Sequence, residues 1–262
     1  MTENQISKDE AGSIHVSIIV ATYNSERHIL SALQSIVEQD IDDLEIIVAD
    51  GGSTDRTVEL IKGSNIQRIK IISEPDRGIG DAWNKGLKLC SGSIIGILNS
   101  DDYYAKETLK NVLPYFDGQE EPLIGFGDVI LIDPQTQVSR RVVGRKRGKF
   151  ALLNGFGFLH PSVFFNRKAL DKVGYFNPRI NVAVDTDWLL RAVSIDIKFK
   201  KVSSLVYMRT GGISDVNKYT GMGEYADALV RNGYSEFQML IFFMLRFLGK
   251  VRKFFYLKKL NE

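Results

Sequence analysis

The sequence has very little cysteine and no long hydrophobic run. Cys90 is the only cysteine among 262 residues, so an internal disulfide is excluded and the chain suits a reducing compartment such as the cytosol. No stretch reaches the roughly 18 to 20 apolar residues that a membrane-spanning helix needs. Residues 1–13 are polar and lack the apolar segment of a secretory signal, so we expect them to form a short flexible lead.

The sequence also lacks a charge excess and the common nucleotide-binding loops. The formal net charge is +2, which gives no overall signal for nucleic-acid binding. The stretch "GIGDAW" fails as a GxGxxG dinucleotide fingerprint because Trp83 occupies the last glycine position, and no GxxxxGK[ST] phosphate loop is present. Internal repeats and low-complexity segments are absent as well. A dinucleotide-binding or phosphate-loop protein is therefore not indicated.

The first 100 residues alternate between apolar runs and amphipathic segments. The runs are rich in Ile and Val and have no polar alternation, which is typical of strands buried on both faces of a parallel sheet covered by helices. Ser25 is a plausible N-cap for the first helix. The predicted strands are 15–24, 44–50, 68–75 and 93–100, and the predicted helices are 25–39, 51–62 and 76–90.

Each predicted strand ends in polar residues: "ATYN", "ADGGS", "SEPD" and "NSDD". The carboxyl ends of parallel strands meet at one edge of the sheet, where ligands of such folds bind. Asp101 and Asp102 are adjacent carboxylates that repel each other. They either cap the helix in "AKETLKNVLPYF" or hold a divalent cation, which prefers carboxylate oxygens and keeps water and phosphate as its other ligands.

The second half is less regular. "PLIGFGDVILID" and "QVSRRVVG" predict a hairpin with its turn near Asp133 and Pro134. "VDTDWLLRAVS" predicts a short helix, "IKFKKVSSLVYMR" predicts strands, and the chain is expected to be mostly helical from Tyr219. We therefore expect a catalytic domain at 14–215, with halves at 14–104 and 105–215, and a helical, basic-amphipathic tail at 216–262.

Several ordered motifs together resemble the family 2 glycosyltransferases, most closely the branch that builds bacterial exopolysaccharide and related surface glycans. They are "VSIIVATYN", "EIIVADGGSTDRT", "SEPDRGIGDAWNKGLKLCSGSIIGILNSDD" and "HPSVFF…VGYFNPRINVAVDTDWLLR", and the resemblance covers about residues 15–210. It implies an α/β fold of the GT-A (Rossmann-like) type, a mostly parallel sheet flanked by helices, here with a C-terminal helical extension. It also implies inverting transfer of a sugar from a nucleotide-diphosphate donor.

The resemblance implies a metal-bound donor site at "NSDD". Asp102 corresponds to the ligand of a divalent metal, Mn²⁺ or Mg²⁺, and Asp101 lies near the donor ribose or phosphates. Asn99 stands where many relatives have a third acid, and Ser100 belongs to the same motif. The end of the first strand is expected to line the base and ribose pocket, or else to form a plain strand-to-helix turn. Its residues are Ala21, Thr22, Tyr23 and Asn24.

The nucleobase itself is a point of departure from the family. Many relatives carry a second acid after the second strand, and it accepts a hydrogen bond from the base; this chain has Gly51 there. Base recognition therefore falls to Asp50 or to backbone groups, unless Asp50 only forms a turn. We favour a UDP-sugar over a GDP-sugar donor.

Further roles fall on three later segments. Arg77 is expected to meet the diphosphate, while Asp81 and Asn84 lie three apart on one helical face and are expected to reach the donor sugar. Asp185 matches the position of the family's catalytic base, which takes the proton of the acceptor hydroxyl; the alternative is a helix N-cap. His160 is expected near the donor sugar or metal, or else is structural.

The charged segments suggest partners. The run 140–149 is either a solvated loop or a lid over phosphates. Residues 235–262 mix bulky apolar residues with Lys and Arg and contain no acid between Glu236 and Glu262, which suits a helix lying on an anionic membrane surface; packing on the core is the alternative. We therefore expect a cytoplasmic protein peripheral to the inner face of the membrane, with a glycan or polyprenyl-diphosphate-linked acceptor. Oligomerisation is possible.

Two other functions are compatible with this type of sheet. A sugar nucleotidyltransferase would normally show a glycine-rich basic loop after the first strand, which "ATYNSERH" is not. A non-catalytic glycan-assembly subunit with a decayed site would not need to keep Asp101, Asp102 and Asp185.

Overall fold

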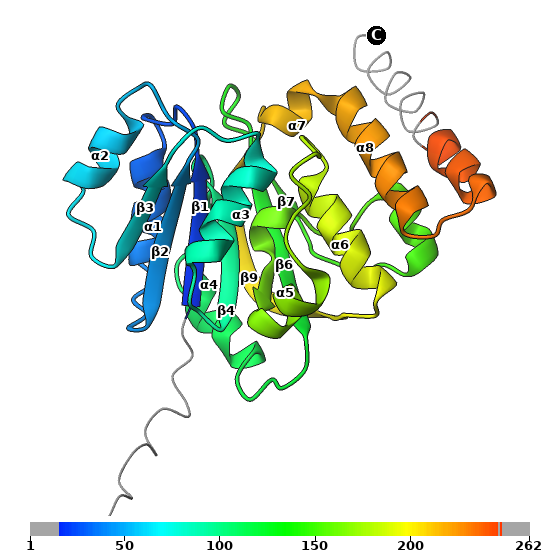
Figure 1. Cartoon of the computed structure of the whole chain (residues 1–262), viewed down its shortest axis with the longest axis horizontal. Coiled ribbons are helices and arrows are strands. Elements are labelled where there is room, and N and C mark those ends of the chain that lie inside the picture. Colours follow the sequence, from blue (N-terminus) through cyan, green and yellow to red (C-terminus); the bar gives the residue numbers. More distant parts are fainter. Residues whose placement is uncertain (1–15, 246, 248–262) are drawn as a thin grey trace, which may run out of the picture.

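The four apolar runs of the first half are strands, and they lie side by side in parallel. The computed structural model describes residues 16–245 and residue 247 (Figure 1). Strands β1 and β2 are buried along their whole length, as expected for a sheet covered on both faces. In this half β1 spans Val16–Thr22, α1 Ile29–Val37, β2 Leu44–Asp50, α2 Thr57–Gly63, β3 Ile69–Ser73, α3 Ile79–Leu89 and β4 Ile94–Asn99.

The second half extends the same sheet with strands of both directions. Within the described residues the order is β3-β2-β1-β4-β8-β6-β9-β5, and β7 pairs with β6 as the predicted hairpin. The predicted α/β fold is confirmed. The elements are β5 Tyr103–Tyr104, α4 Thr108–Val112, η1 Leu113–Tyr115, β6 Leu123–Ile132, β7 Ser139–Val142, η2 Lys149–Asn154, η3 His160–Ser162, β8 Phe164–Asn166, α5 Arg167–Val173, α6 Val184–Ser194 and β9 Lys198–Arg209.

Helices cover both faces of the sheet, and each face has its own core. On one face Ile19 and Ile47 pack with Trp83 and Leu87 of α3, and this core continues to α5, α6 and the C-terminal helices. On the other face α1, α2 and α4 supply the apolar side chains. Figure 1 shows α3 and α5 in front of the sheet, with α1 and α4 behind it. Gly86 lets α3 approach closely, because an added Cβ would overlap the side chain of Ile19.

The last described part of the chain is helical. It consists of α7, Ile213–Val216, of α8, Lys218–Arg231, which contacts α6, and of the helical residues 236–245. Phe242 is fully buried and meets the Tyr225 ring edge-on at 5.6 Å. The tail is therefore anchored on the core through one of its faces. In the described part of the chain, no helix has the length and hydrophobicity to cross a membrane. The predicted lead at 1–13 and most of the basic end of the tail lie outside the described residues.

The predicted N-cap of α1 is wrong, and the capping alternative for Asp101 and Asp102 is excluded. The N-cap of α1 is His28, and Ser25 contributes only its carbonyl to the turn, at 2.9 Å from the amide of His28 and 3.0 Å from that of Ile29. Asp101 and Asp102 do not cap the following helix either, because β5 intervenes and α4 begins only at Thr108. Because they do not cap helices, the side chains of Ser25, Asp101 and Asp102 remain available at the carboxyl edge of the sheet.

Candidate functional site

The carboxyl ends of β1 to β4 meet at one edge of the sheet, as the sequence predicts. In the strand register Thr22 pairs with Asp50, and Asp50 pairs with Ser73. On the other side of β1, Ala21 pairs with Asn99. The loops are tied to this edge by backbone hydrogen bonds, from the Gly51 amide to the Thr22 carbonyl at 2.9 Å and from the Ser100 amide to the Ala21 carbonyl at 3.1 Å.

The first strand end forms a loop that is held by the second. The amide of Asn24 donates to Ser53 Oγ at 2.8 Å, and Asn24 Oδ1 accepts from the amide of Thr54 at 2.8 Å. Asn24 has a positive φ of 48°, a conformation that asparagine tolerates better than most residues. The neighbouring Tyr23 ring is 61 % exposed. Tyr23 is thus free to contact a ligand, whereas Asn24 shapes the loop.

Ser25 and Ser100 connect the first and fourth strand ends. Their hydroxyl oxygens lie 2.7 Å apart and share a hydrogen bond, although 75 residues separate them in sequence. The hydroxyl of Ser25 also donates to the carbonyl of Tyr23 at 3.2 Å. Ser25 was predicted to cap α1, and its side chain instead joins the polar edge.

Asp50 is buried, and its carboxylate is fully engaged within the protein. Oδ2 accepts from the amides of Gly52 and Ser53 at 3.2 and 3.0 Å and from Ser73 Oγ at 2.6 Å. Oδ1 accepts from the hydroxyl of Ser53. The side chain is only 2 % exposed. This is the turn-forming alternative for Asp50, and these bonds fix the "DGGS" loop between β2 and α2.

Asp102 is a buried carboxylate with one oxygen unpaired. Its Oδ1 accepts from the amide of Arg209 at 3.1 Å, while Oδ2 is buried and has no hydrogen-bond partner. The guanidinium of Arg209 donates through Nε to the carbonyl of Asp101 at 3.1 Å. Burial, together with the neighbouring charge of Asp101, raises the pKa of Asp102 well above its usual value. An acid held this way gains from a cation beside Oδ2.

Other polar atoms near this edge are also buried without partners. Buried polar groups are nearly always hydrogen-bonded, and an unmade bond costs about 1–3 kcal/mol, so such a group marks a place where a ligand or water is bound. Five such atoms come from the strand ends and the loop after β4, from α3 and from η3. They are Thr22 Oγ1, Asn99 Oδ1, Asp102 Oδ2, Trp83 Nε1 and His160 Nε2.

His160 links this edge to the second half of the chain. Its ring stacks on Trp83 of α3, with centroids 4.3 Å apart and an interplanar angle of 25°. Burial lowers the pKa of the imidazole below its usual value, and the charge of nearby Asp185 partly opposes that shift. His160 thus lies against α3 and near Asp185.

Asp185 lies in the first turn of α6, one residue after the helix begins. It is half-buried, and its Oδ1 accepts from the amide of Thr186 at 2.7 Å. The N-cap of α6 is Ala183, so Asp185 is not the N-cap. Its carboxylate therefore lies at the amino end of α6, in the first turn of that helix.

The loop before α6 is held by a residue that sequence reasoning missed. The carboxylate of Glu224 on α8 accepts hydrogen bonds from three successive amides, each at 2.8 Å. This replaces the missing N-cap side chain of α6 and fixes the backbone that leads to Asp185. The amides belong to Asn181, Val182 and Ala183.

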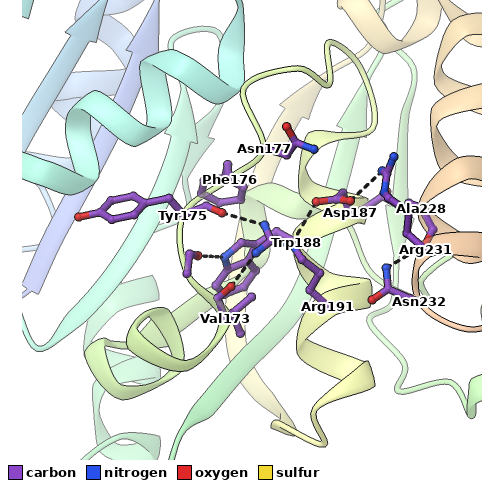
Figure 2. A network of polar contacts seen from close by, with 12 residues as sticks. Val173, Tyr175, Phe176, Asn177, Asp187, Trp188, Arg191, Ala228, Arg231 and Asn232 are labelled. Carbon is purple, nitrogen blue, oxygen red and sulfur yellow. Dashed lines mark hydrogen bonds and ion pairs between the residues drawn. The ribbon is translucent and has the colours of Figure 1, made fainter.

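Asp187, two residues after Asp185, is structural. Its carboxylate accepts from Arg191 Nε at 3.1 Å and from Arg231 Nη2 of α8 at 2.9 Å (Figure 2). The Arg191 guanidinium also donates to the carbonyls of Val173 and Tyr175, at 2.6 and 2.8 Å. Figure 2 shows how this network joins α6, α8 and the loop after α5. Asp185 and Asp187, both in the first turn of α6, thus have different surroundings.

The turn before α3 faces the loop before α6. An added Cβ at Gly80 would lie 3.0 Å from Val184, and one at Gly78 would lie 3.6 Å from Asn181 Oδ1. Asp81 accepts from the amide of Arg77 at 3.2 Å, and the guanidinium of Arg77 is largely exposed. Both side chains therefore remain at the rim of the polar edge.

Asn84 has a different environment from the one predicted. It is buried, its amide nitrogen donates to the carbonyl of Phe176 at 2.8 Å, and its oxygen accepts from the amide of Phe176 at 2.9 Å. Both ends of the amide are thus used by one backbone segment 92 residues away. Asn84 ties α3 to the second half of the chain and has no group left for a sugar.

The described residues contain no cluster of three or more His, Cys, Asp or Glu side chains that would hold a metal by themselves. Asp102 Oδ2 is the acidic oxygen that the local structure leaves without a partner. The geometry suits a cation that takes one protein carboxylate and completes its shell with water and phosphate, as Mg²⁺ and Mn²⁺ do in nucleotide sites.

Comparison with known proteins agrees with this geometry. The Glycosyl transferase family 2 profile matches residues 17–174. A PGL/p-HBAD biosynthesis glycosyltransferase of Mycobacterium tuberculosis is 31% identical over 209 residues, which cover 76% of this chain and 78% of the relative. A chondroitin synthase of Escherichia coli is 28% identical over 201 residues, which cover 74% of this chain but only 28% of that protein.

Solved structures share the fold at lower identity. An S. aureus TarS structure in complex with UDP-GlcNAc superposes with a TM-score of 0.61 at 22% identity, covering 86% of this chain and 69% of that one. This chain spans 41% of another, longer TarS chain. The mannosyltransferase PcManGT of Pyrobaculum calidifontis, in complex with GDP-Man and Mn²⁺, has a TM-score of 0.63 at 20% identity and covers 89% of this chain and 70% of that one. These likenesses show a common GT-A fold.

Proposed function

The chain belongs to glycosyl transferase family 2, and on that premise we propose that it transfers a sugar, with inversion, from a nucleotide-diphosphate donor to a glycan or lipid-linked acceptor in surface-polysaccharide synthesis. The observation that carries the proposal is the set of buried, unpaired polar atoms at the carboxyl edge of the sheet. One of them, Nε2 of His160, belongs to the ring that lies near the charge of Asp185. A bound donor would give these atoms the partners they lack.

We assign the donor to the first-half strand ends. The nucleoside lies against the end of β1, formed by Ala21, Thr22, Tyr23 and Asn24. The diphosphate and sugar lie between "NSDD" and the exposed guanidinium of Arg77, within reach of Asp81 and His160. Charge-assisted hydrogen bonds from Arg to phosphate are strong and support this placement. A UDP-sugar is the favoured donor, and the fold's occurrence with both UDP-GlcNAc and GDP-Man supports a nucleotide-sugar at this place.

Asp102 is the residue that would hold a divalent metal, Mn²⁺ or Mg²⁺. Its unpaired Oδ2 and raised pKa fit a position that a cation completes. When bound, such a metal neutralises the charge that develops on the leaving diphosphate. Arg209 donates through Nε to the carbonyl of Asp101 and through its amide to Oδ1 of Asp102, and these bonds leave Oδ2 of Asp102 without a protein partner.

Asp185 is the proposed base. It takes the proton of the acceptor hydroxyl while the acceptor oxygen bonds to the anomeric carbon and the bond from that carbon to the diphosphate oxygen breaks. The proton ends on Asp185 and the electron pair leaves with the nucleotide diphosphate. A single displacement of this kind inverts the anomeric configuration. The loop before α6, which Glu224 holds, keeps the carboxylate positioned.

The tail supports a membrane-associated acceptor. Its helical residues 236–245 bury Met239 and Phe242. At spacings of three, four and three, the same helix and residue 247 expose a second apolar stripe, which is 51–71 % exposed. The following sequence is basic and has no acid before Glu262. This pattern fits an anionic lipid surface and a polyprenyl-linked acceptor. The stripe consists of Phe237, Leu240, Met244 and Phe247.

Calorimetric titration with UDP, GDP and dTDP, each with and without Mn²⁺, tests the donor site. We expect one nucleotide to bind tightly and only with metal. Absence of binding to all three would contradict the proposal and favour the non-catalytic alternative. A sugar nucleotidyltransferase would instead release pyrophosphate from a nucleoside triphosphate and a sugar phosphate, which a pyrophosphate assay detects.

Co-sedimentation with vesicles tests the tail. We expect the protein to sediment with phosphatidylcholine vesicles that contain phosphatidylglycerol and to remain in solution with phosphatidylcholine alone. Replacing Phe237 and Leu240 by Ser should reduce the bound fraction while leaving nucleotide binding unchanged. Equal sedimentation of the variant and the parent would contradict the membrane assignment.

A further inference from the structure

The residue that reads the nucleobase is not evident from the strand ends alone. Asp50 has both oxygens engaged by the "DGGS" loop and by Ser73, and it is almost fully buried. It has no acceptor free for a ligand. Another group must therefore supply any polar contact to a base bound beside β2.

Gly51 shows where that group lies. Its backbone φ is not among the positive values, so the conformation itself would accept any residue; Gly52, with a φ of 82°, is different. Space is what excludes a side chain at Gly51. An added Cβ would overlap Asp76 Oδ2 and would lie 3.1 Å from Asp76 Cγ. The carboxylate of Asp76 thus fills the volume that a side chain of residue 51 would occupy.

The Asp76 carboxylate is fixed and has an oxygen to offer. Oδ1 accepts from the amide of Gly78 at 2.8 Å, which holds the side chain against the turn. Oδ2 is the oxygen that lies over Gly51. Oδ2 of Asp76 is therefore an acceptor held directly at the backbone of Gly51.

We propose that Asp76 determines the nucleobase of the donor by accepting a hydrogen bond from a ring N–H, as carried by uracil, thymine or guanine. This inference rests on the proposed function and deepens it. A planar base bound beside the Asp76 carboxylate would present its ring N–H to Oδ2, the oxygen that lies over Gly51. Cytosine carries a lone pair in place of the ring N–H, and that lone pair is repelled by a carboxylate.

Titration of variants with nucleoside diphosphates tests the assignment. Wild-type protein is expected to bind the preferred member of UDP, GDP and dTDP more tightly than CDP. Asp76→Ala should lower the affinity for that nucleotide by about 10- to 100-fold, the usual range for a hydrogen bond to a charged group. The affinity for CDP should stay unchanged. Glu74→Gln, an exposed acid of the same loop, is the matched control and should change neither.

Asp76→Asn separates the chemistry from the fold. Asn keeps an oxygen for the Gly78 amide and adds an N–H that can donate to cytosine. We expect its preference over CDP to fall at least about 10-fold while the melting temperature stays that of the parent. An unchanged preference in both Asp76 variants would overturn the proposal.

Moving the carboxylate provides the rescue. The single variant Gly51→Asp should fail to bind the nucleotide, because the new side chain would overlap the carboxylate of Asp76. Gly51→Asp combined with Asp76→Ala should recover affinity relative to Asp76→Ala, since the acid returns from the other side of the gap. No recovery, in a folded double variant, would contradict the idea that the two positions share one volume. If wild-type protein binds no nucleotide, the proposed function fails together with this inference; if it binds and Asp76→Ala binds equally, only this inference fails.

Discussion

Two buried acids at opposite edges of the sheet have opposite surroundings. Glu45 lies at the amino edge, where its Oε1 accepts from Ser17 Oγ at 2.5 Å and from the amide and hydroxyl of Ser91 at 2.6 and 2.9 Å; its Oε2 pairs with Lys70 at 2.7 Å. Asp102 lies at the carboxyl edge and has an oxygen with no partner. Both side chains are almost inaccessible to solvent, and they differ in their hydrogen-bond partners.

The pKa values of the two acids record this difference. Burial alone would raise the pKa of Glu45, but the bonds from Lys70, Ser17 and Ser91 outweigh it and lower the value to about 2. At Asp102 burial and the charge of Asp101 prevail, and the pKa rises. The amino edge is thus completed by the protein itself, while the carboxyl edge is left incomplete. We therefore expect Glu45 at the amino edge to contribute to stability and Asp102 at the carboxyl edge to contribute to the proposed ligand site.

The largest expected effect is the loss of turnover in a variant of Asp185, which lies outside both edges of the sheet. Asp185→Asn keeps an oxygen for the Thr186 amide but removes the basic carboxylate. We expect turnover to fall about 100- to 10,000-fold, the usual contribution of a general base, with nucleotide affinity unchanged. Steady-state kinetics and calorimetry on the same preparation measure the two quantities. Turnover near that of the parent would remove Asp185 from the base role.

Asp102→Asn should abolish the proposed metal site at the carboxyl edge without lowering the stability of the fold. The amide oxygen can still accept from the Arg209 amide, whereas the charge that binds the metal is gone. Metal-dependent nucleotide affinity should drop at least about 100-fold, by analogy with other charge-assisted contacts. The melting temperature should stay equal or rise, because a buried unpaired acid is removed. A marked loss of stability with retained affinity would reverse the comparison.

Glu45→Gln should lower the stability of the fold and leave nucleotide binding unchanged. It breaks the ion pair with Lys70 and weakens the bonds from Ser17 and Ser91, so we expect a loss of about 2 kcal/mol in the free energy of unfolding; the half-exposed Lys70 keeps the figure modest. Denaturant titration measures the change. Nucleotide affinity should be that of the parent, and a parallel loss of affinity would show that the two edges are not independent.

The smallest effect is a dependence of stability on pH. The folded-state pKa of Glu45 lies below its unfolded value of 4.5, so its contribution is fully present above about pH 5 and is lost as the pH falls toward 2. Denaturant titrations between pH 6 and 3, approximate limits set by this window, should show a smaller decline for Glu45→Gln than for the parent. Parallel curves for the two proteins would contradict the assignment.

The sequence predicted the fold's first half well because its signals are local. Uninterrupted apolar runs mark β1 to β4, and the helix predicted from "VDTDWLLRAVS" spans the same residues as α6. The hairpin of β6 and β7 followed from its turn residues. The convergence of the strand ends then required only the rule for parallel sheets, which needs no knowledge of individual contacts.

The missed residues depend on contacts between distant segments. Glu224 holds amides about 40 residues earlier, as helix packing places them, and Arg209 reaches a motif 107 residues earlier. Helical spacing correctly placed Asp81 and Asn84 near each other, but it could not tell that Asn84 turns inward to Phe176. The pairing of Gly51 with Asp76 likewise leaves no pattern in a single sequence.

Helix α8 connects two places that the sequence keeps apart. Glu224 in its middle holds the loop of the proposed base, Tyr225 packs against Phe242 of the terminal helix, and Arg231 at its end pairs with Asp187. The support of the loop before Asp185 and the seat of the terminal helix are thus two consecutive residues of one helix.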